Sequence, residues 1–134
     1  RNLQMAFAKS NIKLTQVQAV VRCSGTGGDS GTIDIDTDIL KSGETASSPT
    51  VDIKRVHWNC ASGASATITR NSVEVMSLTD NGFTDWYGWT ENTENDQDIV
   101  VAITGGNAVV WLELGKVTGF GSQQHQNQGT LGGN

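Results

Sequence analysis

Apolar and polar residues alternate with a period of two along much of this chain, and this feature limits what the chain can fold into. Residues 15–23 (TQVQAVVRC), 32–40 (TIDIDTDIL) and 50–60 (TVDIKRVHWNC) show the alternation clearly. Successive side chains of a strand point to opposite faces, so the pattern indicates strands that bury one face. No segment repeats apolar residues at helical spacing over three turns. We therefore expect strands and little helix.

Short turns rich in glycine and asparagine separate seven or eight such segments. Asn71-Ser72 lies between two alternating segments and predicts a two-residue hairpin, because asparagine accepts a positive φ. Gly105-Gly106-Asn107 predicts a second hairpin on the same grounds. A short strand is expected around residues 83–89 (FTDWYGW). Many short strands at regular spacing predict an all-β chain, folded as a single antiparallel β-sandwich or jelly roll.

The 134 residues suit one domain. We expect an extended N-terminal arm over residues 1–12, a β-sandwich domain over residues 13–120, and a polar tail rich in glutamine and glycine over residues 121–134. The tail has almost nothing to bury, and an ordered backbone costs ~1 to 2 kcal/mol per residue. We therefore expect the arm and the tail to lie along neighbouring subunits.

Charge and hydropathy exclude two classes of partner. Nine basic and fourteen acidic residues give a net charge of −5, with no lysine or arginine cluster to neutralise phosphates, so no nucleic acid is expected. The apolar run IVVAI (residues 99–103) is far shorter than the ~20 residues that cross a bilayer, so no membrane is expected either. Cys23 and Cys60 permit one disulfide without requiring it, and their pairing stays open.

The segment from Gly25 to Leu40 contains two patterns that suggest chemistry. A nucleophilic serine of the chymotrypsin type needs its histidine and aspartate earlier in the chain, whereas both histidines follow the GDSG at residues 28–31. We interpret this motif as a glycine-rich hairpin turn. The aspartates at positions 34, 36 and 38 resemble a calcium loop, but Ile39 and Thr45 stand where an EF-hand needs glycine and glutamate. We expect these carboxylates to project from the solvent face of a strand.

His57 and Cys60 have a spacing that suggests zinc. Residues three apart on a strand point to opposite faces, however, and the chain has too few cysteines and histidines for a structural zinc site. We therefore expect no catalytic residue, no metal site and no cofactor.

The segment from Asp80 to Asp98 gathers aromatic residues among acids and amides. Such side chains plug a core, anchor a protein interface or stack on sugar rings, and all three roles stand open. Leu3, Met5 and Phe7 alternate in the arm and are suited to lie along a partner. The candidate interface residues are Phe83, Trp86, Tyr87, Trp89, Leu3, Met5 and Phe7.

The pattern of residues 50–120, with its Arg-Asn turn, acidic aromatic segment and closing Leu-Glu-Leu strand, resembles small β-sandwich virion structural proteins of tailed bacteriophages. The start MAFAKSNIKL at Met5 also resembles a phage protein start. The resemblance implies a non-enzymatic capsid decoration or cement protein, or a neck or tail component. It implies a homo-oligomer bound to other virion subunits such as the major capsid protein, in a virion assembled in the host cytoplasm.

The chain departs from better-known decoration proteins because it lacks a proline-rich N-terminal arm, which leaves its position in the virion open. The alternative function is a carbohydrate-binding β-sandwich module, from a tail spike or a secreted enzyme, that uses Trp86, Tyr87 and Trp89.

Overall fold

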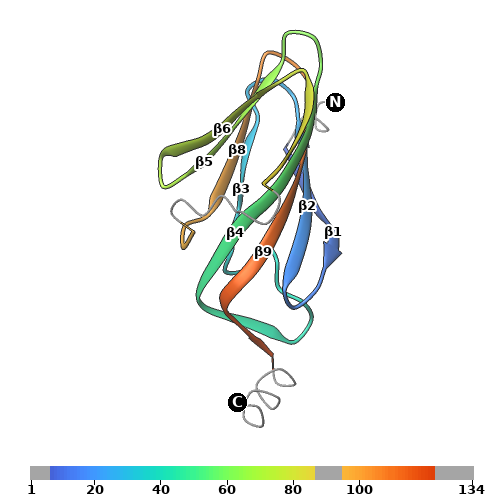
Figure 1. Ribbon diagram of the computed structural model, residues 1–134. Coiled ribbons are helices and arrows are strands. Elements are labelled where there is room, and N and C mark those ends of the chain that lie inside the picture. The colour runs from blue at the N-terminus through green and yellow to red at the C-terminus, as the bar shows by residue number, and fades with distance from the viewer. Residues whose placement is uncertain (1–6, 87–94, 123–134) are drawn as a thin grey trace.

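The computed structural model describes residues 7–86 and 95–122, and these residues form two β-sheets (Figure 1). The strands are β1 (Ala8–Leu14), β2 (Gln18–Gly25), β3 (Ser30–Ile33), β4 (Glu44–Cys60), β5 (Ser65–Arg70), β6 (Val73–Thr79), β7 (Asn81–Asp85), β8 (Ile99–Thr104) and β9 (Ala108–Ser122). Over the same residues no helix has the length and apolar character needed to cross a membrane.

The strand order is that of a jelly roll. One sheet has the order β1-β2-β9-β4-β7, the other has β3-β8-β5-β6, and all neighbouring strands are antiparallel. The chain crosses from one sheet to the other at most connections and stays within a sheet only from β1 to β2 and from β5 to β6. The predicted fold class, an all-β antiparallel sandwich or jelly roll, is confirmed.

Aliphatic side chains from both sheets fill the space between them. The alternation expected in the sequence is visible in β2, β5 and β8, where every second residue is buried. Ile53, Ile68 and Leu112 have no exposed surface and belong to one continuous core. Full burial of such a side chain stabilises the fold by about 1.5–3 kcal/mol, so this core is the main source of stability.

The predicted strand over residues 32–40 is wrong beyond its first residues. β3 ends at Ile33, and residues 35–39 form turns. The Asp38 carboxylate accepts a hydrogen bond from the Asp34 backbone N–H (2.7 Å), and the Asp34 carboxylate accepts one from Asp36 (2.9 Å). Aspartate side chains that bond their own backbone in this way compete with a strand ladder. The three carboxylates therefore do not form a row on a strand face.

The two predicted hairpins have different outcomes. Asn71 and Ser72 have φ values of 50° and 63° and connect β5 to β6, with Arg70 opposite Val73, so this prediction is confirmed. The segment Gly105–Asn107 is not a hairpin, because β8 and β9 belong to different sheets. A Cβ at Gly105 would lie 2.3 Å from the Gly63 carbonyl oxygen, so glycine permits the close approach of two crossings at this end.

The ends of the sandwich domain differ from the expected boundaries. Residues 8–12 were expected in an extended arm, but they belong to β1 and pair with β2. Pairing with β2 satisfies their backbone groups within the domain. β9 continues to Ser122, two residues past the expected boundary, and pairs there with Glu44 of β4. Residues 1–6 and 123–134, which hold the rest of the arm and the tail, lie outside the described residues.

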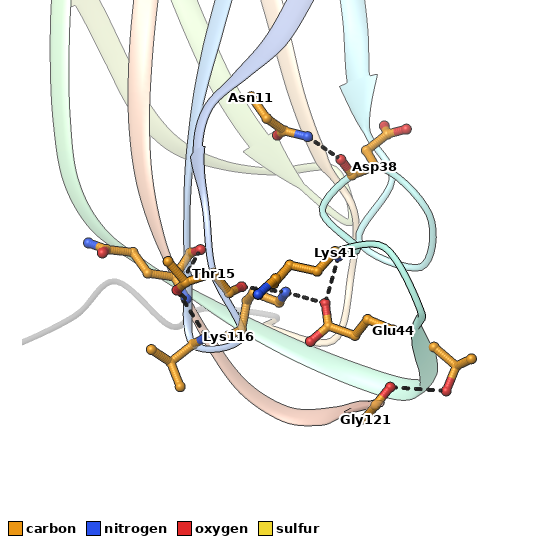
Figure 2. A network of polar contacts seen from close by, with 10 residues as sticks. Asn11, Thr15, Asp38, Lys41, Glu44, Lys116 and Gly121 are labelled. Atoms are coloured by element: carbon orange, nitrogen blue, oxygen red, sulfur yellow. Dashed lines mark hydrogen bonds and ion pairs between the residues drawn. The ribbon is translucent and has the colours of Figure 1, made fainter. Parts of the chain in front are cut away.

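A buried ion pair joins the beginning of β4 to the second half of β9 (Figure 2). The Lys116 and Glu44 side chains are 0% and 2% exposed. Lys116 Nζ donates to Glu44 Oε1 and to the Thr15 carbonyl oxygen (2.9 Å), and Glu44 also accepts from the Lys41 backbone N–H (3.0 Å). The Phe120 ring centroid lies 4.9 Å from Nζ. These contacts fasten the β1–β2 turn, β4 and β9 to one another.

Arg70 is a second buried cation, and its guanidinium binds backbone carbonyl groups. It donates to Val51 (2.8 Å), to Asn95 (3.1 Å) and to Gln97 (2.8 and 3.1 Å), and its side chain has no exposed surface. The Val51 backbone N–H also donates to the Asn95 carbonyl (2.9 Å). Arg70 therefore holds the segment that precedes β8 against β4.

We expect Lys116→Met to lower the free energy of unfolding by about 3 kcal/mol or more, because Glu44 is then left buried without its cation. The double variant with Glu44→Leu should recover most of this loss, since no unpaired charge remains. Urea denaturation of the three proteins measures both effects. A single variant as stable as the wild type would contradict the structural role of the pair.

Candidate functional site

Three rings lie in a row across the outer face of the five-stranded sheet, two of them exposed and one, that of Trp111, half-buried. In the register of the strands, Arg22 of β2 stands opposite Trp111 of β9, Trp111 opposite His57 of β4, and His57 opposite Phe83 of β7. The His57 ring centroid lies 5.2 Å from Trp111 and 5.8 Å from Phe83. Phe83 is 57% exposed and His57 is also exposed. We call Trp111, His57 and Phe83 the aromatic row.

Strand alternation explains why these rings lie on the outer face of the sheet. Val110 and Leu112 are fully buried on either side of Trp111, so the Trp111 side chain must leave the opposite face of β9. Val56 is buried in the same way beside His57. The aromatic row thus stands on the strands that build the core beneath it.

A row of charged side chains borders the aromatic row on one side. Arg55 stands opposite Glu113 and Asp85 in the register, and its guanidinium bonds both carboxylates, with 2.9 Å from Nε to Asp85 Oδ2. Gln18 Nε2 donates to Glu113 (2.6 Å). The hydrogen bonds from Arg55 to Asp85 and to Glu113 raise the pKa of the guanidinium further above its usual range. The charges next to the rings are therefore held in fixed positions by one another.

Small polar residues border the aromatic row on its other side. Val109 stands opposite both Ser24 and Asn59, and Asn59 stands opposite Asn81. The outer face therefore offers rings in the middle, amides on one side and paired charges on the other.

The structure brings only one of the predicted interface residues into this row. Phe83 belongs to it, whereas Trp86 is half-buried and packs against the core. Phe7 also packs against the core, close to Gly31. Leu3, Met5, Tyr87 and Trp89 lie outside the described residues.

Two residues of the aromatic row were not predicted as interface residues. The alternation of the buried residues around Trp111 could have placed it on the outer face, and the same holds for His57 beside Val56. Their meeting with Phe83 could not be read from the sequence, because it depends on which strands pair and in which register.

The other sequence motifs have structural explanations among the described residues. The Asp29 carboxylate accepts from the Thr26 backbone N–H (2.9 Å) in the connection from β2 to β3, so GDSG is a turn that crosses between sheets and not a hairpin. His57 faces solvent on the other sheet, and Ser30 begins β3. Cys60 is buried on the face of β4 opposite His57, as expected.

Both cysteines are free and buried. Burial raises the pKa of the Cys23 thiol to about 12, although Lys9 and Arg22 act in the opposite direction. Burial, together with the negative charge of Asp80, also raises the pKa of Cys60. Because the thiolate is the nucleophile, neither thiol is poised for reaction in the folded protein.

Three carboxylates meet near the turn that follows β3. One oxygen atom from each of Asp34, Asp36 and Asp98 lies within 4.8 Å of the others, whereas Asp38 pairs with Lys9 (2.6 Å). Asp98 accepts from the Ile35 backbone N–H (2.9 Å), so hydrogen bonds within the loop account for part of this arrangement. The expected absence of a metal site stays a prediction.

No family model and no curated protein matches this chain. Among solved structures, it is similar to a conserved protein of unknown function from Streptococcus pyogenes (10% identity over 86% of this chain and 78% of that chain, TM-score 0.49). It is also similar to an uncharacterized protein with a double-stranded β-helix domain from Klebsiella pneumoniae. That match has 12% identity, covers 91% of this chain and 88% of that chain, and has a TM-score of 0.43. A third similar structure is an RmlC-like cupin protein from Desulfovibrio desulfuricans. That match has 10% identity, covers 84% of this chain and 86% of that chain, and has a TM-score of 0.40.

Asp38 should contribute pH-dependent stability. Partial burial alone would raise the pKa of Asp38, but hydrogen bonds from Lys9 and from the Asp34 backbone outweigh it and hold this pKa below its usual range. A lowered folded-state pKa means that the stabilisation is present above about pH 4, the range of an unperturbed aspartate, and is lost as the pH falls through the folded-state value. We expect Asp38→Asn to cost about 1 kcal/mol at pH 7 and to flatten the acid side of the stability curve.

Asp36→Asn is the matched control for this prediction, because the Asp36 side chain is exposed. Urea denaturation between pH 3 and pH 7 measures the effect. Equal acid sensitivity of the Asp38 variant and the wild type would contradict it.

Proposed function

We propose that this chain is a non-enzymatic structural protein of a tailed-phage virion, a capsid decoration or cement protein that docks onto neighbouring subunits through the aromatic row. The observation that carries the proposal is a row of three rings on the outer face of the five-stranded sheet, in which Phe83 and His57 are exposed and Trp111 is half-buried. The resemblance of residues 50–120 to small virion β-sandwich proteins supports it, and the jelly roll is an architecture that viral capsid domains use.

The aromatic row has the properties of an interface centre. Interface hot spots are rich in tryptophan, tyrosine and arginine and cluster near the middle of the contact. Trp111 stands on β9, inside the sheet, with Arg22 beside it. The neighbouring Arg55, Asp85 and Glu113 are already held by one another, so little side-chain entropy is lost when a partner covers them.

We propose that the protein is not an enzyme because of where the possible catalytic side chains lie among the described residues. His57 contacts two rings, and Ser30 stands on the other sheet. The pKa of Cys23 is raised to about 12. Within residues 7–86 and 95–122, these groups therefore do not form the nucleophile, base and orienting group that a triad requires.

The alternative is a carbohydrate-binding module that uses the same face. The pair Asn59 and Asn81, which borders the aromatic row, favours it, because rings and amides together bind a sugar. The interplanar angles of 40° and 85° within the aromatic row, however, show that the three rings do not share a plane. A sugar chain therefore has no flat platform of three rings to lie on, whereas protein side chains can fit between them. The geometry therefore favours a protein partner.

We expect Trp111→Ala and Phe83→Ala each to weaken binding to capsids that lack this protein by about 2 kcal/mol, roughly 30-fold, as for a hot-spot truncation. Co-sedimentation with such capsids measures the affinity, and a thermal melt confirms that each variant is folded. Val17→Ala is the matched control, since Val17 is 67% exposed and lies in the β1–β2 turn.

A glycan array with the same variants separates the two functions. Normal capsid binding by both aromatic variants would contradict the docking proposal. Glycan binding that Trp111→Ala abolishes, without any capsid binding by the wild type, would favour the carbohydrate module.

A further inference from the structure

The outer face of the five-stranded sheet differs in charge from the rest of the chain. Among the described residues, the cations that project from it are Lys13, Arg22, Lys54 and Arg55, and the carboxylates are Asp52, Asp85 and Glu113. The whole chain has a net charge of −5, and many of its acidic groups lie in the loop of residues 34–38 and before β8 at residues 96–98. The face that holds the aromatic row is therefore the less acidic part of the molecule.

Arg22 is the cation that stands in line with the aromatic row. It lies directly opposite Trp111 on the same face, where the Cβ atoms of paired residues are about 4.5–5.5 Å apart. Its side chain is half-buried, because it leaves β2 between the outward neighbours Val20 and Ser24. The guanidinium donates a long hydrogen bond to Ser24 Oγ (3.4 Å) and forms no ion pair with any described residue.

Arg55 shows what Arg22 lacks. The Arg55 guanidinium is bound by the carboxylates of Asp85 and Glu113, so its charge is neutralised within the chain. A guanidinium presents five N–H donors in a fixed fork that matches the two oxygen atoms of a carboxylate. Most of these donors are left to solvent at Arg22.

A partner that covers Trp111 also removes water from Arg22, because the two side chains are neighbours on one face. A cation that loses its water without gaining an acceptor opposes binding. The partner must therefore supply an acceptor at this position, and a carboxylate matches the guanidinium in both charge and geometry.

The arrangement of the other cations favours a protein as the source of this carboxylate. A phosphate backbone needs several free cations along its path. Arg55 is already neutralised, and Lys13 and Lys54 lie on β1 and β4, with β2 and β9 between them. One free guanidinium beside rings and serine residues instead fits one carboxylate in an otherwise uncharged contact.

We propose that the partner docked on the aromatic row is an acidic protein segment, in which one aspartate or glutamate binds Arg22 while a neighbouring side chain packs on Trp111. This inference rests on the proposed function, since it names the chemistry of the partner at the same face. Arg22 then selects among partners by charge, and the rings provide the contact area.

Co-sedimentation with capsids that lack this protein tests the proposal. We expect Arg22→Gln to raise the dissociation constant by about 30-fold or more, because the partner's carboxylate is then covered without a cation. Arg22→Lys should weaken binding less, since it keeps the charge and loses the fork. Lys13→Gln is the matched control, because it removes the same charge from an exposed position at the edge of the same face. A thermal melt confirms that each variant is folded.

A second measurement identifies the partner's acceptor. A water-soluble carbodiimide joins an amine to a carboxylate in direct contact with it, whereas a guanidinium does not react in this way. We expect the complex of Arg22→Lys with capsids to give a cross-linked peptide that joins position 22 to an aspartate or glutamate of a capsid subunit. The wild type should give no cross-link at this position.

The outcomes separate this inference from the proposed function. Normal capsid binding by Arg22→Gln, together with weak binding by Trp111→Ala, would overturn the acidic partner and leave the docking role intact. Equal losses in Arg22→Gln and Lys13→Gln, or no carboxylate cross-linked at position 22, would also overturn it, since the effect would then be a general one of charge or the acceptor would be another group. Wild-type protein that does not bind capsids would contradict both proposals.

Discussion

The antiparallel pairing of β4 with β9 is the interaction on which the rest of the structure depends. These are the two longest strands, and their register runs from Cys60 opposite Ala108 to Glu44 opposite Ser122. A bulge between Ile53 and Arg55 adds one residue to β4, which keeps Val56 in the core and Arg55 on the outer face. Gly115, opposite Asp52 of β4, lies under the end of the Lys54 side chain, since a Cβ there would come within 2.8 Å of Lys54 Cε. One irregularity thus sets both the packing of the core and the charged border of the aromatic row.

Buried cations extend this arrangement to the irregular segments. Lys116 holds the beginning of β4 through Glu44, and Arg70 holds the segment before β8 through backbone carbonyls. Each residue supplies donors to oxygen atoms of these segments, since buried carbonyl and carboxylate groups need donors. The partners are far apart in the chain, with 72 positions between Lys116 and Glu44. Such pairs leave no local pattern in a sequence, and this is why the prediction did not include them.

Predictions from the sequence succeeded where the structure depends on residues that are close together in the chain. Period two placed the core residues of β2 correctly, and Asn71-Ser72 formed its hairpin because a positive φ is a property of single residues. The strand prediction failed at residues 34–38, because aspartate side chains accept hydrogen bonds from the backbone there in place of a neighbouring strand. The crossing at Gly105 and the aromatic row both depend on which sheet a strand joins. Phe83 was found from its type, whereas Trp111 needed the register to reveal its neighbours.

Two of the edge strands, β1 and β3, are protected against pairing with another chain. An exposed edge strand presents unpaired backbone groups, and lysines and bulges protect it from pairing with another chain. β1 carries both devices, since its register shifts around Ile12 and since Lys13 is exposed on it. Lys9 also donates to the Thr32 carbonyl of β3, the edge strand of the other sheet. Strand addition at these two edges is therefore disfavoured. The two outer faces differ in chemistry, with rings and fixed charges on the five-stranded sheet and hydroxyl groups on the four-stranded one.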